Sequence, residues 1–137
     1  MNIAIRYFTK SKKGNTEKLA KAIAKATGQP ALTVENDLSD RVDRLFLVNA
    51  MYAANIDKEV KLFLTRNRDK IGEVVNFSTS ASGKSTVGAV KKVTDELGIQ
   101  LNDKEFHCAA SWIFINKGLP SEADLQKAAG FAVTMTK

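Results

Sequence analysis

Residues 9–16 read Thr-Lys-Ser-Lys-Lys-Gly-Asn-Thr, a short stretch that combines hydroxyl groups, lysines and one glycine. This stretch follows the strand-like residues 3–8 and opens residues 17–26, whose apolar positions recur at helical spacing. A turn of this kind between a strand and a helix is suited to binding phosphate. Its hydroxyls and free backbone N–H groups are donors, and the dipole of the helix favours negative charge at this end. Ordinary helix capping by Asn15 or Thr16 is the alternative interpretation.

The composition is that of a globular domain. Of the 137 residues, 44% are hydrophobic and 26% are charged, so the chain suffices for one core and is too short for two ordinary domains. We therefore expect a single domain over residues 1–137. No apolar run approaches the roughly 20 residues of a membrane helix, no signal-peptide pattern is present, and Cys108 is the only cysteine. These features predict a cytoplasmic protein without membrane contact.

The net charge of +6 has two interpretations. It favours an anionic partner, such as a phosphate ligand, a nucleic acid or an acidic protein, or it reflects a lysine-rich solvated surface. The lysines are spread along the chain, and the one dense group is Lys10, Lys12 and Lys13 in the turn. Aromatic residues make up 7% of the chain, which disfavours a single-stranded nucleic-acid binder.

Strand and helix patterns alternate along the chain. We expect strands at residues 3–8, 31–34, 45–48, 74–77 and 106–115, the last with an interruption at 109–110. Helical spacing lies between them and again after Pro120, and we expect the second helix to end near Gly72. This order predicts an α/β sandwich with a parallel sheet and helices on both faces. Ligands of such sheets bind beyond the carboxyl ends of the strands, which here precede the small-polar loops 9–16, 49–55 and 78–85.

Four motifs in this order resemble the flavodoxin family, including its short-chain members and flavodoxin-like domain proteins. They are Gly-Asn-Thr-Glu at 14–17, Tyr-Ala-Ala-Asn-Ile-Asp-Lys at 52–58, Phe-Ser-Thr-Ser at 77–80, and Asn-Lys-Gly-Leu-Pro at 116–120. The resemblance covers essentially the whole chain. It implies a three-layer sandwich with a five-stranded sheet of order 2-1-3-4-5, non-covalent FMN and electron transfer.

The resemblance also implies where FMN binds. The turn would hold the ribityl phosphate, the two later loops would flank the isoalloxazine ring, and Tyr52 is the aromatic residue nearest that task. The expected FMN-binding residues are Thr9, Ser11, Lys12, Lys13, Gly14, Asn15, Thr16, Ala50, Met51, Tyr52, Ala53, Ala54, Asn55, Ser78, Thr79, Ser80, Ala81, Ser82 and Gly83. We predict no catalytic residue and no metal ligand, so the redox chemistry would belong to the flavin, in an electron carrier or a small FMN-dependent reductase. Its redox partner proteins are not identified by the sequence.

The chain departs from the family in several respects. Asn49-Ala50 and Ala109-Ala110 stand where many relatives have glycine. Lys12 and Lys13 precede Gly14 where the family usually has a shorter hydroxyl-rich loop, and the chain is basic where flavodoxins are typically acidic. These departures support an alternative, a flavodoxin-like fold that has lost or weakened flavin binding and acts as a basic binding or interaction module.

Other residues whose types could take part in catalysis or ligand binding are better explained by structural roles. Gly83-Lys84-Ser85 matches the end of a nucleotide-binding P-loop, but the first glycine of that motif is replaced by Ser78. His107 and Cys108 are neighbours in an expected strand and so point to opposite faces, which disfavours a catalytic pair. Trp112 is expected to pack in the core, and the alternative, which the family resemblance implies, is a position near the cofactor. Arg6 lies in an otherwise apolar strand, where a buried charge needs a partner; we expect its side chain to reach the sheet end.

Overall fold

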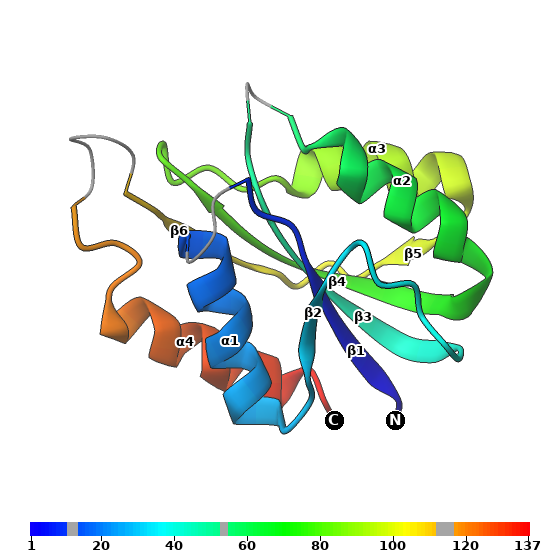
Figure 1. The fold of residues 1–137 in the computed structure, drawn as a ribbon, viewed down its shortest axis with the longest axis horizontal. Helices are drawn as coiled ribbons and strands as arrows, with labels where there is room; N and C mark the ends of the chain where they lie inside the picture. Colours follow the sequence, from blue (N-terminus) through cyan, green and yellow to red (C-terminus); the bar gives the residue numbers. More distant parts are fainter. Residues whose placement is uncertain (11–13, 53–54, 112–116) are drawn as a thin grey trace.

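The computed structural model describes residues 1–10, 14–52, 55–111 and 117–137, and its centre is a parallel β-sheet (Figure 1). The strands lie in the order β2-β1-β3-β4-β5, with β6 also paired to β4. All five pairings are parallel. The predicted α/β class and the order 2-1-3-4-5 are confirmed. The strands of the described residues are β1 (Ile3–Tyr7), β2 (Ala31–Thr33), β3 (Val42–Ala50), β4 (Ile71–Ser80), β5 (Gln100–Leu101) and β6 (Phe106–Ala109).

Helices cover both faces of the sheet, as the sequence predicts. In Figure 1, α1 and α4 lie together on one face, and α2 and α3 lie together on the other. A short 3-10 helix (Arg68–Lys70) follows α2. The helices are α1 (Asn15–Thr27), α2 (Lys58–Asn67), α3 (Val87–Leu97) and α4 (Glu122–Thr134).

Alternating side chains of the central strands build two cores. Along β3, Leu45 and Leu47 belong to the cluster under α2 and α3, while Phe46 and Val48 belong to the cluster under α1 and α4. All four are fully buried. Because successive side chains of a strand point to opposite faces, a strand covered on both sides must be apolar throughout.

The fifth strand position is occupied by two short strands. The sequence predicts one strand over residues 106–115, whereas β5 pairs with the start of β4 and β6 pairs with its end. The interruption therefore lies at residues 102–105, where the Asn102 N–H still donates to the Val74 carbonyl at 2.8 Å. Residues 112–116, including Trp112, lie outside the described part of the chain.

The central strands are longer than predicted at both ends. β3 starts at Val42, three residues before the predicted strand 45–48, and β4 starts at Ile71, so Gly72 lies in a strand and not at the end of a helix. At its other end β4 includes residues 78–80, which we expected in a turn. The strands are longer than predicted because β3 and β4 pair in one register from Val42 with Ile71 to Ala50 with Thr79. This pairing between strands outweighs the local preference of polar residues for turns.

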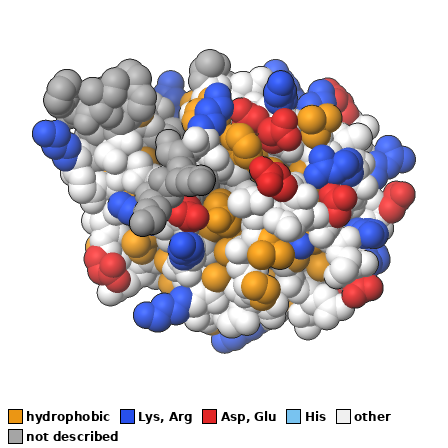
Figure 2. All heavy atoms as spheres, viewed as in Figure 1, with side chains coloured by type: hydrophobic (Ala, Val, Ile, Leu, Met, Phe, Trp, Pro, Cys, Tyr) orange, Lys and Arg blue, Asp and Glu red, His pale blue; other side chains and the backbone are white. Residues whose placement is uncertain are grey.

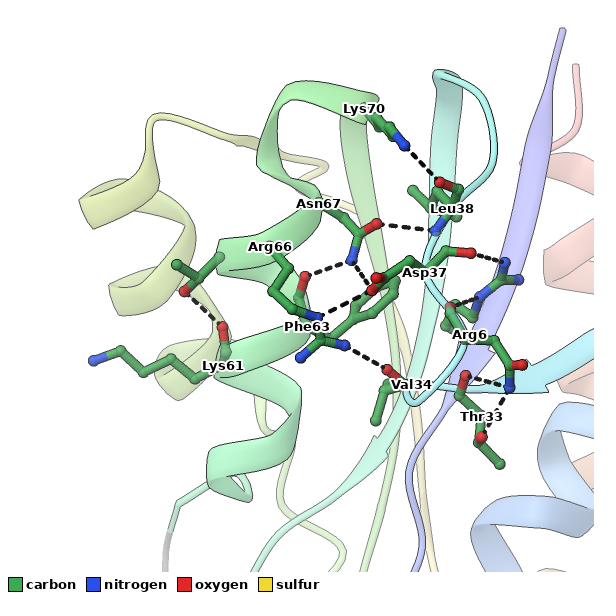
Figure 3. A network of polar contacts seen from close by, with 12 residues as sticks. Arg6, Thr33, Val34, Asp37, Leu38, Lys61, Phe63, Arg66, Asn67 and Lys70 are labelled. Carbon is green, nitrogen blue, oxygen red and sulfur yellow. Dashed lines mark hydrogen bonds and ion pairs between the residues drawn. The ribbon is translucent and has the colours of Figure 1, made fainter.

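Arg6 is buried and binds backbone carbonyls (Figure 3). Its Nε donates to the Asn36 carbonyl at 2.8 Å, and its terminal nitrogens donate to the carbonyls of Asp37 and Ile5. Burial lowers the pKa of the Arg6 guanidinium, while the charge of Asp37 opposes this shift. The loop after β2 is thus held by a cation of the neighbouring strand.

The same loop is fixed from α2 (Figure 3). The buried Asn67 side chain accepts from the Leu38 N–H at 2.9 Å and donates to the Asp37 carboxylate at 3.1 Å. Arg66 donates to the same carboxylate at 3.0 Å. Hydrogen bonds from Asn67 and then Arg66 hold the pKa of Asp37 below its ordinary value. Helix and loop are therefore joined through one carboxylate.

We predict that Gly72→Ala destabilises the protein. An added Cβ would lie 2.7 Å from the Asp43 carbonyl oxygen, and this contact with backbone cannot be relieved by a side-chain rotation. The expected loss is about 1–3 kcal/mol in urea unfolding, as for other overpacked positions. Gly130→Ala is the matched control, because its Cβ meets nothing within 4 Å inside α4. It should stabilise the protein by about 0.5–1 kcal/mol, and an equal loss in both variants would contradict the prediction.

We also predict that Asp37→Asn flattens the acid side of the stability profile. Because the folded protein depresses the pKa of Asp37, its contribution is present above the unfolded pKa and is lost as pH falls through the lower, folded value. Urea midpoints measured from about pH 6 to pH 2 should fall less in the variant than in the wild type. Asp69→Asn, which alters a 96%-exposed carboxylate, is the control. A parallel decline for wild type and Asp37→Asn would refute the linkage.

Candidate functional site

The carboxyl ends of β1, β3, β4 and β6 meet at one edge of the sheet (Figure 1). The segments that follow these strands surround a cavity of about 630 Å³. This volume falls within the range of roughly 300–1,000 Å³ typical of small-molecule sites. The cavity is lined by Thr9, Lys10, Gly14, Asn15, Ala50, Met51, Tyr52, Thr79, Ser80, Ala81, Ala110 and Ser111.

The start of α1 forms one side of the cavity. Gly14 is the N-cap, with extended backbone angles (φ −79°, ψ −179°), and has no side chain to accept from the first turn. By contrast, Asp57 caps α2 by accepting from the Glu59 N–H, and Ser121 caps α4 by accepting from the Asp124 N–H. An N-cap residue without a side-chain acceptor leaves the positive end of the helix dipole uncompensated by that residue, and Gly14 lines the cavity.

Two predicted site residues use their side chains to fix the cavity walls. The Asn15 side-chain amide donates to the carbonyl and the hydroxyl of Ser111, at 3.0 and 3.1 Å. The Thr16 hydroxyl is buried and lies 3.3 Å from the Thr79 hydroxyl. The start of α1 is therefore bound to β4 through Thr16 and to the segment after β6 through Asn15.

The Glu17 carboxylate, in the first turn of α1, is bonded to other side chains of the protein. The Tyr7 hydroxyl donates to its carboxylate at 3.1 Å, and Lys21 lies 4.0 Å from the same oxygen. Burial, together with this hydrogen bond, raises the pKa of Tyr7. The acidic residue nearest the helix start is thus engaged by the protein itself.

Tyr52 forms the aromatic part of the lining and is held from several sides. The Lys10 ammonium lies 4.5 Å from the centre of its ring, and the Lys10 backbone N–H donates to its hydroxyl at 3.3 Å. The ring of Phe8 meets it edge-on, with centroids 6.4 Å apart. Lys10 is in turn 3.5 Å from Asp57, so a cation is anchored beside the aromatic face.

The loop at 78–83 divides into lining and supporting residues. Thr79, Ser80 and Ala81 line the cavity, whereas Ser78 is fully buried and its hydroxyl accepts from the Thr86 N–H. Ser82 lies off the cavity and accepts from the Lys84 N–H.

Gly83 belongs to the supporting part of this loop. Its backbone has positive φ (78°), and its carbonyl lies 3.0 Å from Nδ1 of His107. Residues 79–81 of the predicted loop therefore line the cavity, and Ser78, Ser82 and Gly83 support it.

A buried polar network lies directly behind this edge. Asn49 donates to Asn76 at 2.8 Å, and the Thr86 hydroxyl donates to Asn49 at 2.6 Å. Glu105 continues the chain by accepting from Ser85 at 2.6 Å. These bonds join β3, β4 and the start of α3, so the strand ends that carry the cavity are fixed by side chains as well as by the sheet.

Some predictions fall outside the described residues or outside the cavity. Ser11, Lys12, Lys13, Ala53 and Ala54 are not described by the structure. Asn55 is exposed and lies beside the cavity, paired through its backbone with Tyr52.

Three lining residues, Lys10, Ala110 and Ser111, were not among the predicted site residues. The group of lysines in the turn was a sequence signal for Lys10. For Ala110 and Ser111 the only signal is that small residues follow an expected strand.

The remaining candidates for chemistry keep their structural roles. Cys108 is buried, and burial, followed by the charge of Asp124, raises its pKa to about 11, so its thiol stays protonated at neutral pH. His107 is exposed on the other side of the strand, as the alternation predicts. Within the described ranges, no group of three or more metal-ligating side chains converges. Among the helices described, none is long and apolar enough to cross a membrane.

Several solved structures with this arrangement are flavodoxins. An archaeal flavodoxin superposes with a TM-score of 0.75 at 14% identity, covering 98% of this chain and 96% of its own. A short-chain flavodoxin associated with a bacterial microcompartment gives 0.70 at 16% identity over all of both chains. Flavodoxin 2 of Bacillus cereus gives 0.68 at 18% identity, covering 99% and 98%. This chain has the flavodoxin fold. No protein-family model and no curated protein sequence matches it.

We predict that Gly14→Asp blocks an anion at the start of α1. A carboxylate at this N-cap would accept from the first-turn N–H groups and stabilise the protein by about a few tenths of a kcal/mol. The Gly14→Asp substitution should weaken FMN binding by about tenfold or more, because the carboxylate would occupy the expected phosphate position and repel the phosphate. It should weaken the binding of riboflavin, which lacks the phosphate, far less.

Gly14→Ala is the matched control, since it adds the Cβ without the charge. Fluorescence titration of both flavins against the wild type and both variants gives the comparison. If Gly14→Ala loses as much FMN affinity as Gly14→Asp, the effect is steric and the anion site is rejected.

Proposed function

We propose that this chain is an FMN-binding electron-transfer protein that acts as a single domain over residues 1–137. The observation that carries the proposal is the cavity at the carboxyl edge of a flavodoxin-fold sheet, with Gly14, the N-cap of α1, in its wall. A phosphate dianion suits a helix N-terminus, and a flat ring suits a cavity with small walls. Ala50, Ala81 and Ala110 are such walls, and Tyr52 offers an aromatic surface.

The residues present fit FMN, and each has a defined task. Backbone N–H groups at the start of α1 would hold the phosphate, and Thr9 and Lys10 would line its approach. Tyr52, held by Lys10 and Phe8, would limit the movement of the ring and its contact with water. The bound flavin supplies the redox chemistry, while the protein contributes binding, orientation and electrostatics.

We favour an electron carrier over a reductase. His107 and Cys108 lie on opposite sides of β6 and offer no nucleophile–base pair. In either case the flavin would supply the redox chemistry, so the assay with NAD(P)H below separates a carrier from a reductase. We also propose a cytoplasmic location, because the lone cysteine is a free buried thiol. The net charge of +6 supports the second candidate, a basic interaction module that has lost its flavin.

Purification followed by flavin titration decides between the two candidates. We expect a yellow protein, or one that turns yellow with FMN and binds it with micromolar or tighter affinity. The bound flavin should be reducible by dithionite and should pass its electrons to cytochrome c. Oxidation of NAD(P)H by the loaded protein would identify a reductase instead of a carrier. Absence of binding at high micromolar FMN would reject FMN and leave the basic module.

A further inference from the structure

A second hollow of about 670 Å³ lies between α1 and α4, on the outer face of these helices. We call it the α1/α4 groove. Its floor consists of Ala22 on α1 with Leu125 and Ala129 on α4, all half-buried. Figure 2 shows this face, where hydrophobic atoms lie beside lysine and arginine side chains. The groove is separate from the residues that line the cavity at the sheet edge.

The two sides of the groove differ in charge. Lys18, Lys21 and Lys25 border it on α1, and Glu122 and Gln126 border it on α4. The three lysines recur at i, i+3 and i+7, so they share one face of α1 and span two helical turns, about 10 Å. The groove is therefore cationic along one side and mildly acidic along the other.

The lysines are available to a partner. Lys18, Lys21 and Lys25 are exposed, and among the described residues no salt bridge involves Lys18 or Lys25. Lys21 meets Glu17 only at 4.0 Å. The opposite face of α1 is already used, since Leu19, Ala20 and Ile23 are fully buried against the sheet. The helix thus has a second, unpaired face of small apolar and cationic residues.

We propose that the α1/α4 groove binds an amphipathic α-helix of a partner protein, with acidic residues along one flank. Large apolar side chains of that helix would fill the space above Ala22 and Ala129, where the small residues allow close approach. Carboxylates spaced at i, i+3 or i+4, and i+7 would face the lysines of α1. The side next to Glu122 would be basic or uncharged.

The charge difference across the groove selects this occupant. A nucleic acid or an anionic membrane presents negative charge on every side and would meet Glu122 as well as the lysines. A membrane-binding face also carries large exposed apolar side chains, whereas the floor here is mainly alanine. A helix with one acidic flank matches both the shape and the asymmetry.

The probe is a fluorescein-labelled helical peptide of about 18 residues, with leucines along one face, glutamates on one flank and glutamines on the other. Binding to the full chain is followed by fluorescence anisotropy. We expect micromolar affinity that weakens as salt is added, because exposed ion pairs are screened. A peptide with glutamines in place of the glutamates should bind at least about tenfold more weakly.

Variants of the chain locate the binding. Lys18→Glu combined with Lys25→Glu should weaken binding of the acidic peptide by about tenfold or more. Ala22→Gln should also weaken its binding, because the larger side chain would occupy space at the floor of the groove. Lys61→Glu combined with Lys92→Glu, on α2 and α3, is the matched control and should leave binding unchanged. Circular dichroism and urea unfolding establish that each variant is folded.

Three results would overturn the proposal. The first is absence of binding of the acidic peptide at millimolar protein. The second is equal binding by the wild type and the Lys18→Glu, Lys25→Glu variant. The third is charge-dependent binding to phosphatidylserine vesicles or to an oligonucleotide that exceeds binding to the peptide. Because no flavin takes part, this test stands or falls independently of FMN binding.

Discussion

Side chains alternate along β3 and β4 into two separate apolar clusters, so these strands are stable only when helices cover both faces of the sheet. Parallel strands require a crossover between them. The connections β1–β2, β3–β4 and β4–β5 supply α1, α2 and α3, and α4 follows β6. The same connections bring the carboxyl ends of β1, β3 and β4 to one edge. The cavity lies where it does because the loops that enter the helices all start there.

The carboxyl ends of the strands would be poorly fixed by sheet hydrogen bonds alone, because the ladder of backbone hydrogen bonds stops there. Buried side chains supply the missing bonds: Asn49, Asn76 and Thr86 bond to one another behind the cavity, and Thr16 contacts Thr79 in its wall. Among the described residues, no buried side-chain polar atom lacks a hydrogen-bond partner. A satisfied network of this kind fixes geometry before a ligand arrives.

The elements and their order were predictable from the sequence because they depend on local periodicity. Gly28 and Gly98 end α1 and α3 with positive φ, as glycines at helix ends do. The tertiary roles were not predictable. Two partners of Arg6 are the carbonyls of Asn36 and Asp37, about thirty residues further along the chain, and the side chain of Asn15 bonds to Ser111. Such pairings depend on how loops approach one another in space, which no spacing along the chain encodes.

The short outer strands have a consequence for self-association. β2 has three residues at one edge of the sheet, and at the other edge β5 has two and β6 has four, against nine in β3 and ten in β4. An exposed strand edge is a template on which another chain can add a strand, and a long edge is the greater hazard. The fold places its long, apolar strands β3 and β4 inside the sheet and short strands at both edges, which limits the edge that a second molecule could extend.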